Sequence, residues 1–354
     1  MSLYVDVEKQ LGAFSLSIKF DTCGKWQGIL GASGCGKSMT LKMISGIEKP
    51  DRGRIVLNGN VLFDSEEGIC LPPQKRNVGY LFQNYALFPN MTVMKNIECG
   101  LKKADPEHVA ELLSMLELTG LENRYPDQLS GGQQQRTALA RCLAGRPDAI
   151  LLDEPFSALD EFLREKLQQD IKNVLRQYSG ELLLVSHSRD EVFRFCDRIT
   201  ILDDGRSVAD GKTSEVFGDP VHVTAARLSG CKNISPAERR GEYEVFAKDW
   251  GIALSTDRPV SDKIKYIGIR AHDIVAVDES IDEKSNRIAA PKTNSISAVV
   301  AEVQDSMFET DVIFKCGTGR LWWKTAKDDR SRMYTENAQQ KLVLPPDRLM
   351  LLES

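Results

Sequence analysis

The segment that most constrains the fold is a glycine-rich stretch at residues 31–38, Gly-Ala-Ser-Gly-Cys-Gly-Lys-Ser. An apolar run at residues 25–30 precedes it, and a helical stretch at residues 38–45 follows it. This order matches the pattern GxxxxGK[ST] of a phosphate-binding P-loop, in which backbone N–H groups and the positive end of a helix hold phosphate oxygens. The chain is therefore expected to begin with an α/β domain in which residues 25–30 form a buried strand.

The residue types in this stretch predict how phosphates are held. Lys37 supplies a cation to the β- and γ-phosphates, and the Ser38 hydroxyl is expected to be a ligand of Mg²⁺. The other residues predicted to contact the nucleotide here are Gly31, Ala32, Ser33, Gly34, Cys35, Gly36 and Met39.

A second apolar strand ends in two carboxylates at residues 150–154, Ile-Leu-Leu-Asp-Glu. Asp153 suits a water-mediated contact to Mg²⁺, and Glu154 suits a base that orients the attacking water. Alone, such a strand end is more often simply solvated. The P-loop upstream favours the catalytic interpretation.

Residues 129–133 read Leu-Ser-Gly-Gly-Gln and precede a helix expected from Gln134 onward. A helix start of this kind binds anions through its free N–H groups. By itself it is an ordinary loop and N-cap. Because the P-loop already holds the phosphates of one nucleotide, a second phosphate-binding segment is useful only for another nucleotide.

Taken together, these motifs resemble the nucleotide-binding subunits of ABC transporters over the first ~230 residues. The resemblance implies an ATPase that uses ATP and Mg²⁺ and works as a homodimer. In it, Ser130, Gly132 and Gln133 of one subunit would close over the ATP held by the P-loop of the other.

The resemblance also assigns roles to residues outside those motifs. Gln83 matches the glutamine that touches Mg²⁺, Asp160 matches the residue that bridges the dimer, and His187 matches the histidine that contacts the γ-phosphate. Phe14 is the candidate for the aromatic ring that stacks on adenine. An equally good explanation is that Phe14 is a core residue of a half-buried strand.

Residues 85–93 resemble the surface groove in which importers of this family receive a coupling helix of the membrane subunit. Phe88 and Met91 are candidate apolar contacts there. The alternative is that both residues pack within a helical insertion. The two interpretations stay open.

Organisation along the chain predicts two domains. Residues 1–230 alternate apolar strands with helical stretches, as in an α/β domain, with a helical subdomain at about residues 87–146; the resemblance implies that this domain is a P-loop NTPase of the ABC cassette type with a RecA-like core. Residues 231–354 contain short β-rich runs separated by glycine, serine, aspartate and proline, which predicts a smaller all-β, OB-like barrel domain.

Composition excludes several classes of protein. The net charge of −5 does not favour a nucleic-acid surface, and no apolar run approaches the roughly 20 residues of a membrane helix. Eight scattered cysteines without a CxxC pair make a zinc site or a disulfide framework improbable. We therefore expect no nucleic-acid partner. The resemblance implies a peripheral position on the cytoplasmic face of the cell membrane, two membrane-spanning permease subunits and, indirectly, an extracytoplasmic substrate-binding protein.

The cargo is predicted from weaker resemblances. Residues 53–59 and 67–76 look most similar to the ATPases of molybdate importers, and residues 295–324 resemble a small barrel repeat associated with molybdate. Lys292 and the Thr293 or Ser295 hydroxyls suit an oxyanion, although an ordinary solvated loop explains them equally well. The predicted function is ATP-driven uptake of an oxyanion, foremost molybdate. The alternatives are sulfate, tungstate, iron, polyamine or sugar import.

The sequence disfavours two further classes of protein. A non-transport ABC ATPase of DNA repair or translation would carry a long coiled coil or two fused cassettes, and the sequence has neither. An oxyanion sensor without ATPase activity is disfavoured because Lys37, Asp153, Glu154 and His187 are all present.

Overall fold

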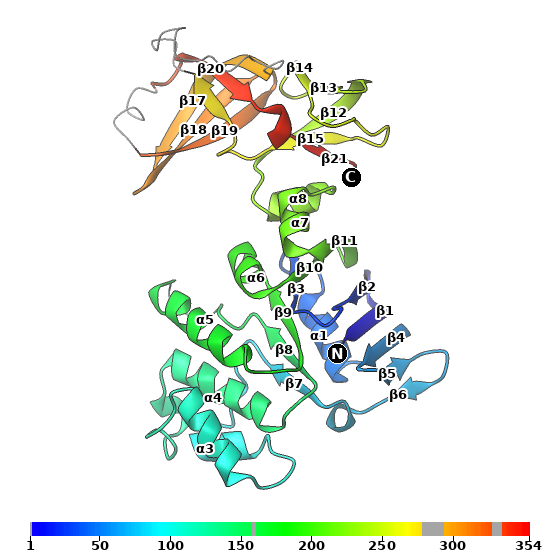
Figure 1. Ribbon diagram of the computed structural model, residues 1–354, viewed down its shortest axis with the longest axis vertical. Helices are drawn as coiled ribbons and strands as arrows, with labels where there is room; N and C mark the ends of the chain where they lie inside the picture. Colours follow the sequence, from blue (N-terminus) through cyan, green and yellow to red (C-terminus); the bar gives the residue numbers. More distant parts are fainter. Residues whose placement is uncertain (1, 158–160, 278–293, 328–334) are drawn as a thin grey trace. The chain divides into compact units, whose positions relative to one another are not determined.

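The computed structural model describes residues 2–157, 161–277, 294–327 and 335–354. The chain divides into two compact units, Met1–Ser214 and Glu215–Ser354 (Figure 1). The division precedes the boundary expected near residue 230. The reason is that α7 (Thr213–Gly218) and α8 (Val223–Leu228) make contacts within the second unit, where Arg270 donates to the Phe217 carbonyl and the Val223 N–H donates to the Ser354 carbonyl.

One large sheet forms the centre of the first unit, in the order β6-β5-β4-β1-β2-β11-β10-β3-β9-β8-β7. From β10 to β7 neighbouring strands are parallel, whereas most of the other pairs are antiparallel. The strands of the parallel part are β3 (Gln27–Gly31), β7 (Val78–Leu81), β8 (Ala149–Asp153), β9 (Glu181–Ser186) and β10 (Arg198–Asp203). The remaining strands are β1 (Leu3–Leu11), β2 (Phe14–Asp21), β4 (Arg52–Leu57), β5 (Asn60–Asp64), β6 (Ile69–Cys70) and β11 (Arg206–Lys212).

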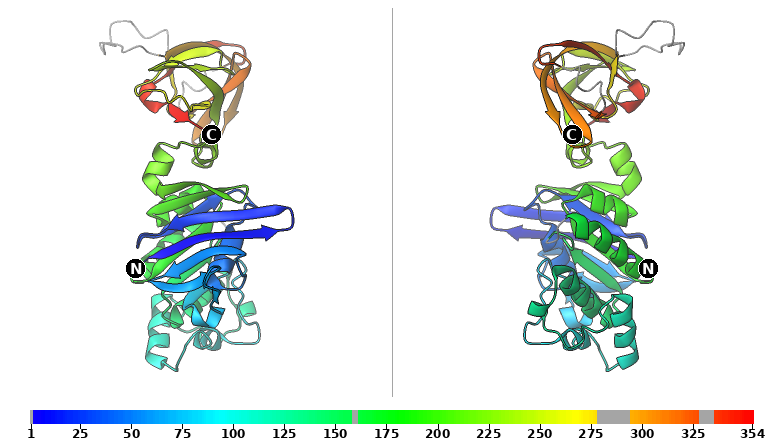
Figure 2. Two further views of the ribbon diagram at one scale, coloured as in Figure 1. Left: turned by 90° about the vertical axis from the view of Figure 1, so that its right-hand side faces the viewer. Right: turned by 90° about the vertical axis from the view of Figure 1, so that its left-hand side faces the viewer.

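Burial explains why the parallel strands have almost continuous apolar sequences. Every residue of β3, β8 and β9 is buried, as expected for parallel strands that are covered on both faces. The β1–β2 hairpin instead alternates buried and exposed residues, and its turn extends beyond the neighbouring strands of this unit (Figure 2). The parallel strands therefore form the buried centre of the unit.

The α-helices of the first unit begin and end at recognisable signals. Helix α1 (Lys37–Ser45) follows Gly36 and ends at Gly46, whose φ of 82° is in the left-handed region that glycine favours. Thr92 caps α2 (Val93–Glu98), and Asp105 caps α3 (Pro106–Met115). The others are α4 (Gly131–Ala144), α5 (Glu161–Leu175) and α6 (Arg189–Phe195), with 3₁₀ turns at Pro73–Lys75 and Pro126–Gln128.

Helices α2, α3 and α4 lie between β7 and β8 in the sequence, inside the expected helical subdomain at about residues 87–146. Helix α4 packs against α2, α3 and β7. These helices gather at the end of the unit that lies away from β1 and β2 (Figure 1).

The second unit contains two five-stranded sheets around one apolar core. The first has the order β14-β13-β12-β15-β21, formed by β12 (Asn233–Gly241), β13 (Glu244–Ala247), β14 (Ile252–Ser255), β15 (Tyr266–Ile269) and β21 (Met350–Leu352). The second has the order β16-β20-β17-β18-β19, formed by β16 (Val275–Val277), β17 (Asn294–Asp305), β18 (Glu309–Cys316), β19 (Gly319–Ala326) and β20 (Gln339–Leu344), with a 3₁₀ turn at Pro346–Arg348. The prediction of an α/β domain followed by a smaller β domain is confirmed.

Two asparagine side chains join the edges of these sheets. The Asn233 amide accepts from the Trp322 N–H at 2.6 Å and donates to the Trp322 carbonyl at 2.8 Å. The Asn294 amide makes the same pair of bonds with Ser255, at 2.7 and 2.8 Å. Each asparagine is the first residue of a strand in one sheet and hydrogen-bonds to an edge strand of the other sheet. The two boundaries between the sheets, here called the Asn233 seam (first) and the Asn294 seam (second), are therefore closed in the same way.

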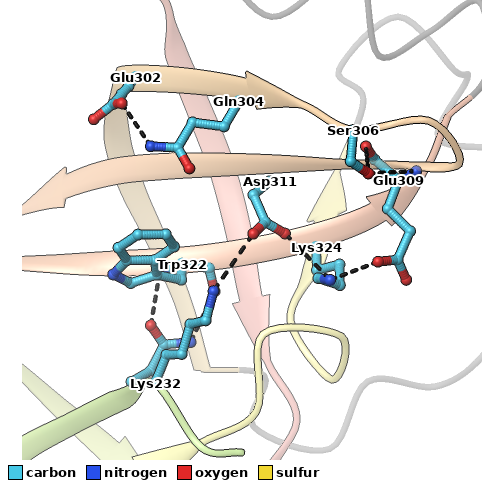
Figure 3. A network of polar contacts seen from close by, with 9 residues as sticks. Lys232, Glu302, Gln304, Ser306, Glu309, Asp311, Trp322 and Lys324 are labelled. Carbon is cyan, nitrogen blue, oxygen red and sulfur yellow. Dashed lines mark hydrogen bonds and ion pairs between the residues drawn. The ribbon is translucent and has the colours of Figure 1, made fainter. Parts of the chain in front are cut away.

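Polar contacts on the outer face reinforce the first seam (Figure 3). The Lys232 ammonium lies 4.4 Å from the centre of the Trp322 ring and 3.5 Å from an Asp311 oxygen. Lys324 joins Asp311 to Glu309, at 3.7 and 2.5 Å. The charged ends of these pairs are still partly exposed to solvent, so each pair contributes little to stability and the apolar core dominates.

Candidate active site

The P-loop connects β3 to α1 and requires glycine at two points. Gly34 and Gly36 have φ values of 81° and 105°, which side chains with a Cβ rarely adopt. A Cβ on Gly36 would also lie 2.6 Å from Leu16 Cδ1. The turn therefore places Lys37 at the first position of α1, where free backbone N–H groups face outward.

Lys37 is held inside the turn. Its Nζ donates to the carbonyl oxygens of Gly31 and Ala32 at 2.9 and 2.8 Å, and the residue is only 5% exposed. Ala32 and Ser33 are exposed, whereas Cys35 is buried and burial raises the pKa of its thiol. Met39 packs against the apolar core.

Asp153, at the end of β8, meets Ser38 of α1. The Ser38 hydroxyl donates to Asp153 Oδ1 at 2.8 Å, and the Tyr80 hydroxyl on β7 donates to Oδ2 at 2.9 Å. The Asp153 carboxylate and burial together raise the pKa of Tyr80, burial being the larger cause. Tyr80 therefore stays a donor that fixes the carboxylate, a role the sequence alone did not reveal.

Glu154 lies one residue beyond β8, between Gln83 and His187. Gln83 Nε2 donates to Glu154 Oε2 at 3.3 Å, and His187 Nδ1 lies 3.4 Å from Oε1. Glu154 has a φ of 44°, and its N–H donates to the Val185 carbonyl of β9 at 2.9 Å. This left-handed conformation turns the side chain out of the strand direction at a cost of about 1–3 kcal/mol, which is typical of functional sites.

The sheet order explains why these residues meet. Strands β3, β9, β8 and β7 are adjacent and parallel, so their carboxyl ends share one edge of the sheet. The P-loop follows β3, His187 follows β9, Glu154 follows β8, and Gln83 follows β7 closely. Ligands of open α/β sheets bind at this edge.

The fit to Mg²⁺ can be judged from the donors present. Mg²⁺ is usually held by one or two carboxylates, water and substrate phosphates rather than by a cage of protein ligands. Within the described part of the chain, no group of three histidine, cysteine or acidic residues could hold a metal. The paired Ser38 hydroxyl and Asp153 carboxylate suit an ion that shares its coordination with phosphates.

Ser130, Gly132 and Gln133 lie at the start of α4. The helix begins at Gly131, three residues before the start expected at Gln134, although glycine has a low helix propensity. A capping box compensates, since Ser130 N donates to Gln133 Oε1 at 3.0 Å and Gln133 N to Ser130 Oγ at 3.4 Å. Among the described residues, no hydrogen bond or ion pair joins these three residues to the P-loop or to Glu154.

The remaining residues predicted to bind the nucleotide, the partner chain or an oxyanion are placed differently from one another. Phe14 begins β2, is half-buried and packs against the core beside Gly205. Asp160, Lys292 and Thr293 lie outside the described residues, and Ser295 is exposed on β17. The roles expected of these residues stay predictions.

The segment after Gln83 is held by an arginine that the sequence did not single out. Arg141 of α4 donates to the carbonyl oxygens of Tyr85 and Ala86, both at 2.8 Å, and both residues have positive φ. The ring of Phe88 lies 5.6 Å from the Arg141 guanidinium and is 46% exposed. Met91 is half-buried. Phe88 thus presents apolar surface in the segment that follows Gln83.

In the residues that the structure covers, no helix is both long and apolar enough to cross a lipid bilayer.

Comparison with known proteins identifies related chains. Residues 14–157 match the family model described as ABC transporter. The sulfate/thiosulfate import ATP-binding protein of Chromobacterium violaceum is 38% identical over 83% of this chain and 78% of its own length. The molybdenum import ATP-binding protein of Paramagnetospirillum magneticum is 34% identical over 90% of each chain. The spermidine/putrescine import ATP-binding protein of Haemophilus influenzae is 37% identical over 79% of this chain and 77% of its own length.

A solved dimer of an ATP-binding cassette, bound to ADP and Pi in a post-hydrolysis state, is also similar. It is 30% identical, covers 60% of this chain and 99% of its own, and has a TM-score of 0.50.

Proposed function

The chain belongs to the ATP-binding subunits of ABC importers, and on this premise we propose that its ATP hydrolysis drives uptake of molybdate. It is an ATPase whose ligands are ATP and Mg²⁺. We also propose which residues perform the hydrolysis, how two chains cooperate and which cargo is imported.

The convergence of Gln83, Glu154 and His187 on one sheet edge carries the proposal for the chemistry. Glu154 is the base that orients the attacking water, and His187 contacts the γ-phosphate. Lys37 neutralises phosphate charge when its amine leaves the P-loop carbonyls for the nucleotide. Mg²⁺, when bound beside Ser38 and Asp153, supplies charge neutralisation on the phosphate oxygens.

A homodimer completes each site. The start of α4 has free N–H groups and carries Ser130, Gly132 and Gln133, which have no contact with the P-loop of their own chain among the described residues. We assign them to the ATP held by a second copy, with Asp160 bridging the two chains. Phe14 is proposed to stack on adenine from the end of β2.

The homodimer is proposed to act on the cytoplasmic face of the membrane with two membrane-spanning permease subunits. An extracytoplasmic protein would deliver the cargo to these subunits. Closing and reopening of the ATPase pair is the two-state element that drives transport. Phe88, with its exposed ring, is proposed to contact a permease segment.

Molybdate is proposed because the likeness to the molybdenum import protein spans 90% of both chains and so includes the second unit. Lys292, Thr293 and Ser295 are proposed to bind an oxyanion in that unit. The second candidate is sulfate, which the 38% identity to a sulfate/thiosulfate import protein favours. Tungstate, iron, polyamines and sugars are the remaining alternatives.

The chemistry is tested by ATP turnover of the chain with its permease subunits, comparing wild type with Glu154→Gln. Wild-type turnover with none in the variant supports the assignment. Absence of turnover in the wild-type complex contradicts it.

The cargo is tested separately by uptake of labelled molybdate in cells with and without this chain, with unlabelled sulfate, spermidine or sugar as competitors. Uptake that depends on the chain and resists sulfate supports molybdate. Uptake of labelled sulfate with no molybdate uptake selects the second candidate.

A further inference from the structure

His187 lies in a short turn that two serines hold from both sides. Strand β9 ends at Ser186 and α6 begins at Arg189. The Ser186 hydroxyl accepts from the Ser188 N–H at 2.9 Å, which closes the turn beneath His187. The His187 side chain itself is 61% exposed and reaches Glu154 at 3.4 Å. Its position is therefore set mainly by the backbone of this turn.

Glu191, in the first turn of α6, is bonded to both serines. The Ser186 hydroxyl donates to Glu191 Oε2 at 2.5 Å, and the Glu191 N–H donates to Ser188 Oγ at 3.4 Å. The first bond involves a carboxylate and is short, as charge-assisted hydrogen bonds are. One residue thus fixes both ends of the turn that presents His187.

The other carboxylate oxygen of Glu191 points to α5. Gln168 of α5 donates to Glu191 Oε1 at 3.3 Å, and the Gln168 carbonyl oxygen accepts from Arg194 of α6 at 3.2 Å. Gln168 and Glu191 are only 5% and 6% exposed. The turn, α5 and α6 therefore share one buried polar network.

Burying the Glu191 carboxylate costs free energy, and a purely structural role does not explain that cost. Burial raises its pKa, and the Glu154 charge does so too, whereas the Ser186 bond and the charges of Arg164 and His187 oppose the rise. Helix α6 does not need this carboxylate, because the Ser188 side chain already caps it. A buried carboxylate kept where a cap already exists indicates that its acceptor oxygens have another use.

We propose that Glu191 is a positioning residue that holds the His187 turn in register with Glu154 and ties this turn to α5. The inference rests on the proposed function, since it takes His187 to act in ATP hydrolysis. Helix α5 follows the segment that contains Asp160 in the sequence, so the network links the turn to the element next to the proposed dimer contact.

The test uses the full chain with Glu191→Gln, His187→Ala and the double variant. Glu191→Gln is expected to lower kcat at least about tenfold while the KM for ATP changes less than about twofold, because the variant displaces His187 from its productive position without removing a nucleotide contact. Because Glu191 acts through His187, the double variant is expected to match His187→Ala alone. Glu165→Gln, which removes the negative charge from an exposed α5–α6 ion pair with Arg194, is the matched control and should hydrolyse ATP normally.

A second readout does not depend on hydrolysis. With ¹³C-labelled histidine the chain gives signals from four residues, His108, His187, His222 and His272. Glu191→Gln is expected to shift the His187 signal and leave the other three in place. If that variant folds poorly, Ser186→Ala removes the same link to the turn and is read in the same way.

If Glu191→Gln lowers the kcat of the His187→Ala variant by the same factor as it lowers that of the wild type, the inference is overturned, because the effect then bypasses His187. An unmoved His187 signal also overturns it. If His187→Ala alone hydrolyses ATP at the wild-type rate, the proposed role of His187 fails, and the signal shift then decides whether Glu191 sets its position.

Discussion

Replacing Arg76 with methionine is expected to destabilise the first unit strongly. Arg76 is 1% exposed and lies just beyond the 3₁₀ turn Pro73–Lys75. Its Nη1 donates to the carbonyl oxygens of Met43 and Ile44, at 2.7 and 2.9 Å, and its Nε to that of Leu71 at 2.8 Å. Two of these acceptors lie in the last turn of α1, where a cation also interacts favourably with the helix dipole.

The magnitude follows from these three bonds. Hydrogen bonds to a charged group contribute about 1.5–3 kcal/mol each, so their loss alone would cost about 4.5–9 kcal/mol. Methionine recovers the desolvation cost of a buried cation, which is several kcal/mol. The Met43 carbonyl also keeps the Gly46 N–H as a donor at 3.3 Å. We expect a net loss of about 3 kcal/mol, which lowers the melting temperature by about 6–12 °C for a domain of this size.

Scanning calorimetry of the full chain measures this shift, with Arg52→Met as the matched exposed control. Arg76→Lys keeps the charge but lacks the planar fork, so it should fall between wild type and Arg76→Met. Nucleotide affinity well below the melting temperature should change less than about twofold, because the P-loop is at the other end of α1. If Arg76→Met melts with the Arg52→Met control, the buried arginine does not hold α1 in place.

Four further outcomes are expected. Lys37→Ala should lose binding of a fluorescent ATP analogue, because its amine is the cation of the P-loop; retained affinity would contradict this. Glu154→Gln should bind ATP normally while phosphate release falls at least about a hundredfold, within the range typical of a lost general base; turnover at the wild-type rate would remove Glu154 from that role. Tyr80→Phe removes the 2.9 Å bond to Asp153 and should cost about 1.5–3 kcal/mol in thermal unfolding, a change that an unaltered melting curve would exclude. Backbone hydrogen bonds lower the pKa of Asp64 from 3.8 in the folded chain. The contribution of this carboxylate to stability is therefore present above pH 3.8 and is lost as the pH falls through the lower folded-state pKa. The difference in melting temperature between wild type and Asp64→Asn should shrink below about pH 3.8, and a constant difference would show that this carboxylate is not involved.

Local patterns made the centre of the active site predictable. The strand expected at residues 25–30 and the helix expected at residues 38–45 correspond to β3 and α1, with ends that differ by at most two residues, and the apolar strand expected before Glu154 corresponds to β8. Each pattern couples an apolar run to a glycine-rich or polar end, which is a short-range signal. Because β3, β9 and β8 are parallel neighbours, their polar ends meet at one edge of the sheet.

The supporting residues were not predictable for a physical reason. Tyr80 meets Asp153 across 73 positions of the sequence, and Arg76 meets Met43 across 33. No periodicity marks a single tyrosine or arginine whose partner is a distant carboxylate or carbonyl. Glu191 is close to His187 in sequence, yet only its burial against Gln168 distinguishes it from an ordinary acidic residue in the first turn of a helix.

The domain division shows a similar limit. The change in composition near residue 230 marks where the β-strands start, whereas α8 and the end of α7 belong to the second unit, through the Val223–Ser354 backbone bond and the Arg270–Phe217 bond. The Glu353 N–H donates to the Val221 carbonyl, a contact that only the folded chain brings together. Composition reflects only the local sequence, whereas contacts between residues far apart in the sequence decide which helices belong to which unit.

That pairing has a consequence for synthesis. The first unit has all of its strands once β11 (Arg206–Lys212) has been made, so it can fold while the ribosome is still translating the rest. The second unit needs residues much further along the chain, because β21 (Met350–Leu352) must pair with β15 and the Ser354 carbonyl must meet the Val223 N–H. The strands of the ATPase half are thus available well before the β half can close.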